Sequence, residues 1–258
     1  MLKLSRRTVM LGALAPAFPR LSWAQSDEIR VICSGGFTAA YNILAPRFEQ
    51  ITGKKVASAY GASMGNAPDA IPQRLARGEP TDIIILARPA LDDFSARSVV
   101  RPDSRVDLAE SRIGVAVRAG APKPDISTVD ALRRTLLGAS SIAYSASASG
   151  VYISTELYKR LGIEAEVMPK SRRILSERAA AVVARGEAEI GFQQISEIIH
   201  VAGVDYLGPL PPDVQHITVF ASGLAATSSE ADAAKALVRY LTGPAAGPVL
   251  KKHGLEPG

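Results

Sequence analysis

Strand-like and helix-like segments alternate along almost the whole chain, and this alternation limits the fold more than any other feature of the sequence. Residues 31–33 form a short apolar run, residues 38–52 carry apolar side chains at helical spacing, and Gly53 follows as a helix stop. Residues 82–87 contain a continuous apolar run, which is typical of a strand buried on both faces of a sheet. Such alternation predicts an α/β protein with mostly parallel sheets.

The alternating segments fall into two groups, which predict two lobes. One sheet-and-helix unit opens the chain, a second occupies its middle, and the last segment is placed to rejoin the first. We predict lobe one over 25–110 plus 218–258 and lobe two over 111–217, with a ligand cleft between the lobes. Open α/β sheets bind ligands where their strands end, so a site is expected in the loops that follow the strands.

The first 24 residues have the pattern of a secretory signal peptide. Arg6 and Arg7 precede an apolar stretch over 9–18, and Ser22 and Ala24 supply the small residues of a cleavage site. The apolar stretch is too short to span a membrane. We therefore predict a periplasmic protein, and the paired arginines leave the twin-arginine route and the general secretory route both open.

The charge balance argues against a nucleic-acid partner. Four of the 30 basic side chains and none of the 25 acidic ones lie in residues 1–24, so the formal charge of +5 falls to +1 without that segment. Such a chain has no overall positive field to attract nucleic acid. The single cysteine, Cys33, lies in an apolar strand, and the three histidines are scattered. We therefore expect no disulfide, no zinc site and no cofactor.

Four segments place small or polar residues where a strand ends and a helix begins. They are residues 34–36, 61–65, 147–150 and 191–194. Helix N-termini present free N–H groups and a partial positive charge, and small side chains let the backbone approach a ligand. Serine hydroxyl groups add neutral donors, so the set favours a site that holds an anion mainly by neutral hydrogen bonds. None of the segments matches a nucleotide-binding fingerprint.

Three arginines lie near the start of a helix predicted over 174–185. Arg172 and Arg173 precede this helix, and Arg178 lies within its first turns. Such a group is usually a solvated face. An arginine turned toward the cleft would instead bind a carboxylate through two parallel hydrogen bonds, and Arg178 is the candidate for that role.

Residues 61–65 also match the Gly-x-Ser-x-Gly nucleophile elbow of α/β-hydrolases, with Ser63 as the nucleophile. Three features count against this alternative. No oxyanion segment of the His-Gly-Gly-Gly kind precedes it. Pro68 delays the helix that should begin directly after the elbow, and His200, His216 and His253 lie in no evident triad loop. A serine hydrolase is therefore the weaker alternative.

Several stretches, in their order along the chain, resemble the periplasmic substrate-binding proteins of ABC importers, in particular the molybdate/tungstate-binding proteins. They include VICSGGFTAAYNILAPRFEQITGKKV, YGASMG, RLARGEPTDIIILA, VARGEAEIGF and LVRYLTGPAAGPVLKKHGLEP. The resemblance implies a type II periplasmic-binding-protein fold whose two lobes close on one small anion and deliver it to an ABC permease. We accordingly expect a monomer that is not an enzyme.

The resemblance also implies which residues hold the ligand. Ser34 and Ser63 match two family serines, Ser149 falls where the family commonly has alanine, and Gln194 falls where it has tyrosine. The extra polar groups suggest a larger ligand, because unpaired buried donors cost about 1–3 kcal/mol each. We predict a molybdate-like oxyanion, with a small organic carboxylate as the alternative. The predicted ligand-binding residues are Ser34, Gly35, Ser63, Ser149, Gly150, Ser176, Arg178 and Gln194.

Overall fold

The computed structural model describes residues 28–258, and the predicted signal peptide over 1–24 lies outside them. The strands are β1 (Glu28–Ser34), β2 (Lys55–Gly61), β3 (Ile83–Ala87), β4 (Val106–Arg118), β5 (Ile142–Ser145), β6 (Ser171–Ile174), β7 (Ile190–Gln194), β8 (Val204–Pro209), β9 (Ile217–Leu224) and β10 (Leu255–Pro257). The α-helices are α1 (Gly35–Thr52), α2 (Ile71–Ala76), α3 (Arg88–Ala96), α4 (Val129–Gly138), α5 (Ala148–Tyr152), α6 (Tyr158–Arg160), α7 (Glu164–Val167), α8 (Ala179–Ala184), α9 (Ile195–Ile198), α10 (Ala231–Leu241) and α11 (Ala246–Lys252).

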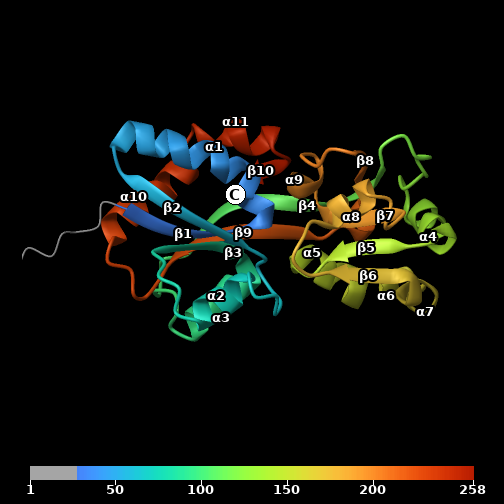
Figure 1. The fold of residues 1–258 in the computed structure, drawn as a ribbon, viewed down its shortest axis with the longest axis horizontal. Coiled ribbons are helices and arrows are strands. Elements are labelled where there is room, and N and C mark those ends of the chain that lie inside the picture. The colour runs from blue at the N-terminus through green and yellow to red at the C-terminus, as the bar shows by residue number, and fades with distance from the viewer. Residues whose placement is uncertain (1–27) are drawn as a thin grey trace, which may run out of the picture.

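Lobe one is built on the parallel strands β2, β1 and β3, with helices on both faces (Figure 1). Successive side chains of a strand point to opposite faces, so a strand with apolar residues at every position is expected to be buried on both faces. In β3, Ile83 and Ile85 pack with α1, α10 and α11, whereas Ile84 and Leu86 pack with α2 and α3. The predicted burial of this strand on both faces is confirmed.

Lobe two repeats this arrangement around β5, which pairs in parallel with β6 and β7. Ile142 and Tyr144 of β5 pack against α4 and the helical segment over 148–160. Ala143, between them, packs against Val182 and Val183 of α8 on the other face. Both lobes therefore place strand ends and helix starts toward each other across the middle of the molecule (Figure 1).

The 13-residue strand β4 links the two lobes. Residues 106–112 pair with β9 in lobe one, and residues 113–117 pair with β7 in lobe two. All the pairings of β4 are antiparallel, as is the pairing of β3 with β9. The prediction of mostly parallel sheets therefore holds only for the strands within each lobe and is wrong for the strands that join them. The residue boundaries of the lobes remain a prediction.

The helix predicted over 174–185 begins later than expected. Ile174 ends strand β6, residues 175–178 form a loop, and α8 begins at Ala179. Strand β6 is at the end of the sheet, and its Arg172 and Arg173 are exposed. Charged residues are common on such edge strands, and they conceal the apolar pattern by which a strand is recognised. Ser176 therefore lies in a loop and not at a helix start.

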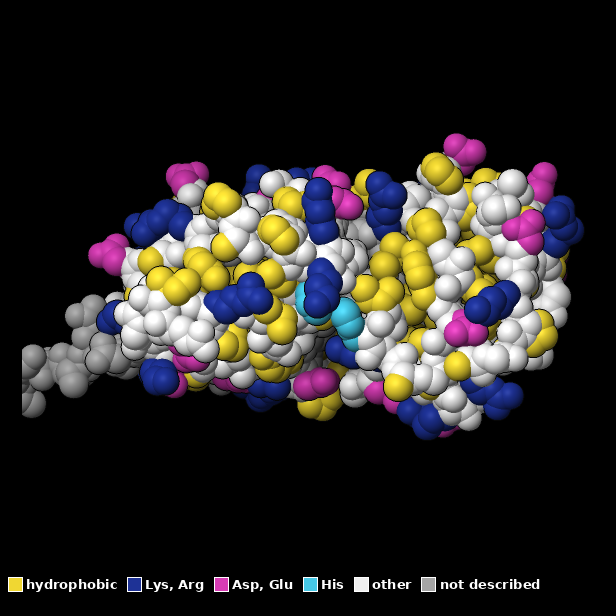
Figure 2. Space-filling view, turned by 90° about the horizontal axis from the view of Figure 1, so that it is seen from above, with side chains coloured by type: hydrophobic (Ala, Val, Ile, Leu, Met, Phe, Trp, Pro, Cys, Tyr) yellow, Lys and Arg dark blue, Asp and Glu magenta, His cyan; other side chains and the backbone are white. Residues whose placement is uncertain are grey.

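A pair of histidines lies near the middle of the face shown in Figure 2, where basic and acidic side chains are interspersed. His200 follows α9 and His253 follows α11, and Nδ1 of His253 lies 2.8 Å from Nε2 of His200. The contact thus joins a segment of lobe two to one of lobe one. Among the helices over 28–258, none has the length and apolar character needed to cross a membrane.

Candidate functional site

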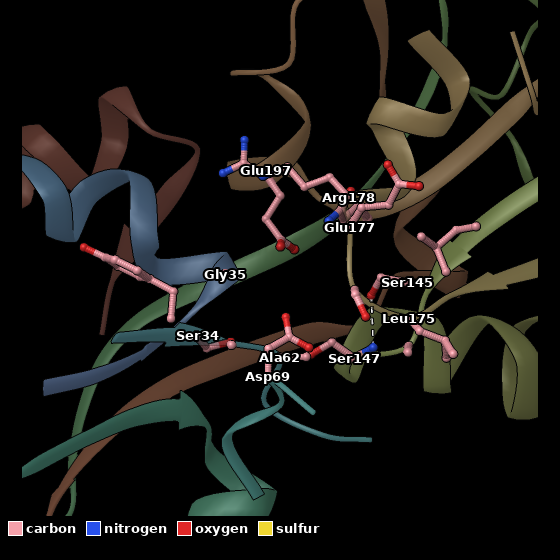
Figure 3. Close-up of a pocket in the computed structure, with 16 residues that line it drawn as sticks. Ser34, Gly35, Ala62, Asp69, Ser145, Ser147, Leu175, Glu177, Arg178 and Glu197 are labelled. Atoms are coloured by element: carbon pink, nitrogen blue, oxygen red, sulfur yellow. Dashed lines mark hydrogen bonds between the residues drawn. The ribbon is translucent and has the colours of Figure 1, made fainter. Parts of the chain in front are cut away.

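A cavity of about 260 Å³ lies where the strand-end loops of the two lobes face each other (Figure 3). This volume is close to the lower end of the range of about 300–1,000 Å³ for small-molecule sites, so the cavity suits a compact ligand. Lobe one contributes Ser34, Gly35, Tyr60, Gly61, Ala62 and Asp69 to its walls. Lobe two contributes Ser145, Ala146, Ser147, Ile174, Leu175, Ser176, Glu177, Arg178, Gln193 and Glu197.

Ser34 and Gly35 form the wall at the start of α1, as the sequence predicts. Ser34 ends β1, and Gly35 is the first residue of the 18-residue helix, whose N-terminus carries a partial positive charge. Ser63 lies behind Ser34 and does not line this cavity. The Ser63 hydroxyl group donates a 2.7 Å hydrogen bond to Ser34 Oγ and accepts one of 3.0 Å from the Ala87 N–H. Ser63 therefore orients Ser34.

Two hydrogen bonds join the lobes beside the cavity. The Ser63 N–H donates to Ser147 Oγ at 3.2 Å, and Ser196 Oγ donates to the Gly36 carbonyl oxygen at 2.7 Å. The first bond links a loop of each lobe, and the second links the first turn of α9 to the first turn of α1. The described arrangement is therefore a closed one, of the kind that two-lobed proteins reach by hinge motion.

Ser149 and Gly150 lie in α5 but do not line the cavity. Ser149 is buried, with its Oγ 3.5 Å from Ser145 Oγ, and a Cβ on Gly150 would collide with the carbonyl oxygen of Ser145. Gly150 thus permits α5 to pack closely on β5. Ser145 and Ser147 reach the cavity instead, and the Ser147 N–H donates a 3.1 Å hydrogen bond to Ser145 Oγ. Ligand contacts by Ser149 and Gly150 stay a prediction.

Gln193, and not Gln194, lines the cavity. Neighbouring residues of a strand point to opposite faces, so the two glutamines of β7 cannot both face the ligand. Gln194 points away, and its Nε2 donates a 2.8 Å hydrogen bond to Thr218 Oγ1 on β9. The Gln193 side chain accepts a 3.3 Å hydrogen bond from the Ala180 N–H at the start of α8. A resemblance in sequence position does not determine which of two adjacent residues faces a site.

Ser176, Glu177 and Arg178 reach the cavity from the loop between β6 and α8. Glu177 is held by Arg185 through hydrogen bonds of 2.8 and 3.0 Å, and this pairing lowers the pKa of Glu177. The Arg178 side chain makes no hydrogen bond or ion pair with any residue of the described chain, 28–258. No hydrogen bond within these residues occupies its guanidinium donors, and a ligand contact by Arg178 stays a prediction.

Glu197 is a site residue that the sequence analysis missed. It lies in α9, directly after β7, and its carboxyl group points toward Gly35 across the cavity (Figure 3). Oε1 lies 2.5 Å from the position that a Cβ on Gly35 would take. Burial raises the pKa of Glu197 from 4.5 to about 7, although the Arg178 charge and hydrogen bonds from Gln193 and Gln194 oppose the rise. An acidic residue in the first turn of a helix is common, so the sequence alone did not single it out.

Neither a serine–histidine pair nor a metal-ligand cluster is present in the described residues 28–258. The Ser63 hydroxyl group contacts Ser34 and Ala87, while His200 contacts His253 and His216 stacks on Tyr152. No group of three or more His, Cys, Asp or Glu residues in this range is arranged to hold a metal ion. The geometry thus gives no support to the hydrolase alternative.

Residues 29–256 match a family model described as bacterial extracellular solute-binding protein. The chain is 45% identical over 251 residues to the aconitate isomerase of a Pseudomonas species, with 97% of this chain and 96% of that protein covered. It is 29% identical over 268 residues to the molybdate-binding protein ModA of Azotobacter vinelandii, with 97% of each covered. The resemblance to molybdate-binding proteins is therefore confirmed.

The fold is also found in solved structures. The periplasmic molybdate-binding protein of Azotobacter vinelandii superposes on this chain with a TM-score of 0.72 at 21% identity. The superposition covers 89% of this chain and 99% of that one. The predicted two-lobed α/β fold is confirmed by this match, which at such identity concerns the fold alone.

The expectation that the chain is not an enzyme is overturned by the Pseudomonas relative. A protein named as an isomerase shares 45% of its residues with this chain along nearly the full length of both. The expectation depended on a resemblance to carriers, and a shared scaffold does not determine chemistry. Whether a protein with this fold transports its ligand or converts it depends on the residues that face the ligand.

Proposed function

Because the chain belongs to the bacterial extracellular solute-binding protein family, we propose that it closes its lobes on a small unsaturated tricarboxylate and interconverts the cis and trans isomers of that acid. The isomerase relative supports the reaction, and the cavity between the lobes supports a compact ligand. The oxyanion preferred from the sequence thus gives way to the organic carboxylate that was its alternative.

The observation that carries the proposal is Arg178, which lines the cavity and whose side chain makes no hydrogen bond or ion pair within residues 28–258. Arginine binds a carboxylate through two parallel, charge-assisted hydrogen bonds. Asp69, Glu177 and Glu197 line the same cavity. A tricarboxylate carries its negative charges on separate groups, so it can place them near Arg178 and the start of α1 and keep them away from the three acidic side chains. A compact oxyanion such as molybdate has its charge on one centre and cannot separate it in this way.

The chemistry of isomerisation fits a site of this kind. A carbon–carbon double bond does not rotate freely, but the isomers interconvert when the double bond moves to the neighbouring carbon. In aconitate a CH2 group adjoins the double bond, and moving one proton between the two outer carbons regenerates the same molecule with either geometry. This step requires an acid–base group and donors that stabilise the negative charge, both of which side chains supply.

We infer a periplasmic location from the family and from the periplasmic molybdate-binding protein that shares the fold. The bonds from Ser63 to Ser147 and from Ser196 to Gly36 join the lobes in the closed form, and the family supports carriage of the same acid to an ABC permease as a second function. A ligand that bridges both lobes shifts the population toward this closed form. The twin-arginine route and the monomeric state stay predictions.

The activity is tested by incubating the protein that begins at residue 25 with trans-aconitate and following both isomers by proton NMR. We expect the cis isomer to accumulate until the two reach equilibrium. Arg178→Gln should raise KM at least ten-fold, whereas Arg134→Gln, on the exposed face of α4, should leave it unchanged. Tight binding of molybdate in calorimetry, together with no conversion of aconitate, would contradict the proposal.

A further inference from the structure

Glu197 extends a carboxyl group across the cavity from lobe two to the first turn of α1 in lobe one (Figure 3). We propose, on the basis of the proposed function, that this carboxyl group is the acid–base group that moves the proton between the two outer carbons of the substrate. It would act as base toward one carbon and, once protonated, as acid toward the other.

The position of Glu197 brings it to the parts of the site that bind the substrate. Its Oε1 lies 2.5 Å from where a Cβ on Gly35 would be, so the carboxyl group occupies the space that the glycine leaves open. Ser34 and Gly35 line the cavity where α1 begins. A substrate between Arg178 and this helix start therefore lies beside Glu197.

The environment of Glu197 gives it the acidity that the role requires. Burial raises its pKa to about 7, and the Arg178 charge prevents a larger rise. A general acid–base group works best with a pKa near the operating pH, where both of its forms are populated. An ordinary glutamate, with a pKa near 4.3, would be a weaker base at neutral pH.

The other acidic side chains of the cavity are less suited to the role. Glu177 is bound by both terminal nitrogens of Arg185, and its lowered pKa makes it a weak base. Asp69 is in the loop between β2 and α2, on the opposite wall, and is the direct competitor of Glu197. Asp69→Asn is therefore part of the test.

The proton transfer balances without a co-reactant. The Glu197 carboxylate takes a proton from the CH2 carbon, and the electron pair of that C–H bond forms a new double bond to the central carbon. The electron pair of the old double bond moves to the other outer carbon, which takes the proton back from Glu197. Negative charge spreads over the three carbons and the attached carboxylates, and the charge of Arg178, which already acts on Glu197, would stabilise it. Nothing is oxidised, reduced or lost.

The test compares Glu197→Gln, Glu197→Asp and Asp69→Asn with a control, Glu166→Gln, whose residue is exposed on α7. Glu197→Gln should lower kcat at least 100-fold and change KM by less than three-fold, because glutamine keeps the shape and loses the proton transfer. Glu197→Asp, which retains a carboxyl group, should recover part of the rate. Calorimetry with trans-aconitate should show that Glu197→Gln still folds and binds.

Two further readouts separate catalysis from a structural role. In D2O the wild-type product should contain deuterium where the proton on the Glu197 carboxyl group exchanges with solvent before it returns to the substrate, and Glu197→Gln should incorporate none. The kcat/KM of the wild type should rise with pH through about 7, and this rise should vanish in Glu197→Gln. A Glu197→Gln protein with a rate within three-fold of wild type, or loss of the reaction in Asp69→Asn alone, would overturn the inference. A wild-type protein that leaves aconitate unchanged would instead refute the proposed function.

Discussion

The backbone N–H of Ser63 donates a 3.2 Å hydrogen bond to the hydroxyl oxygen of Ser147, which joins the lobes at the edge of the cavity. The hydroxyl group of the same Ser63 holds Ser34, which lines the cavity. The N–H of Ser63 thus helps to hold the lobes together, while its hydroxyl group orients the serine that lines the cavity. The loop of lobe one is in this way connected to both the ligand wall and the opposite lobe.

Replacing Ser147 with alanine should weaken binding of the carboxylate, since the bond from Ser63 forms only on closure. Loss of one hydrogen bond costs about 0.5–1.5 kcal/mol, which corresponds to roughly two- to ten-fold in affinity. Titration calorimetry measures the change. Ser127→Ala, at an exposed position before α4, should bind as the wild type does. Equal affinities of Ser147→Ala and wild type would show that this bond does not contribute to closure.

Gly35→Ala should impair isomerisation without unfolding the protein. The added Cβ would lie 2.5 Å from Glu197 Oε1, and the end of this flexible side chain has to move. We expect a ten- to 100-fold lower kcat and a melting temperature within a few degrees of wild type. Gly138→Ala at the end of α4, where a Cβ meets no atom within 4 Å, is the matched control. A fully active Gly35→Ala protein would exclude a fixed position for the carboxyl group.

Glu197 should make stability fall as the pH rises toward neutral. Its pKa is about 7 in the folded protein and 4.5 in the unfolded chain, so folding takes up a proton between these values. The stability gained from this uptake is complete below pH 4.5 and is lost through pH 7. Urea unfolding should show Glu197→Gln gaining on the order of 1–3 kcal/mol over wild type between pH 4.5 and 8. Parallel pH curves for the two proteins would contradict the raised pKa.

Asp82, directly before β3, should be important for stability. Its carboxylate accepts a 2.9 Å hydrogen bond from the Arg30 N–H and one of 2.7 Å from Ser228 Oγ, and it is buried. Asp82→Ala leaves both donors unpaired and should cost about 2–4 kcal/mol in urea unfolding. Asp92→Ala, which breaks a half-exposed pair with Arg105, should cost less than about 1 kcal/mol. Similar losses in the two variants would contradict this assignment.

The contact between His200 and His253 should stop stabilising the fold when the pH falls below about 6.5 and the two rings become protonated. Burial lowers the pKa of both, and the charges of Arg178 on His200 and of Lys252 on His253 act in the same direction. Folding therefore favours the neutral pair, and its contribution is present above pH 6.5 and is lost as the pH falls. Thermal melts of the wild type should drop more between pH 7 and 5 than those of His253→Gln. His216→Gln, whose residue stacks on Tyr152, should keep the wild-type dependence.

The sequence predicted the parts of the site that depend on local pattern. Ser34 and Gly35 mark a strand end and a helix start, and both line the cavity. Arg178 was selected because a guanidinium in a cleft binds a carboxylate, and it reaches the cavity although its helix begins one residue later. Glu197 could not be found in this way, because its role depends on Gly35 in the other lobe, 162 residues away in the chain.

The same limit applies to the sheet. The apolar run of β3 shows that it is buried on both faces, but no local pattern shows that β9 runs against it. The pairing of β3 with a strand more than 100 residues later is a property of the assembled fold. For this reason the parallel strands within the lobes were predicted, and the antiparallel strands between them were not.

Strand β4 changes its partner between Arg112 and Ile113, from β9 of lobe one to β7 of lobe two. A single covalent strand thus runs through both halves of the molecule, and the halves cannot part without twisting its backbone at that point. Opening of the lobes would therefore bend the chain at residues that do not line the cavity, so substitutions there would alter ligand release without touching the ligand.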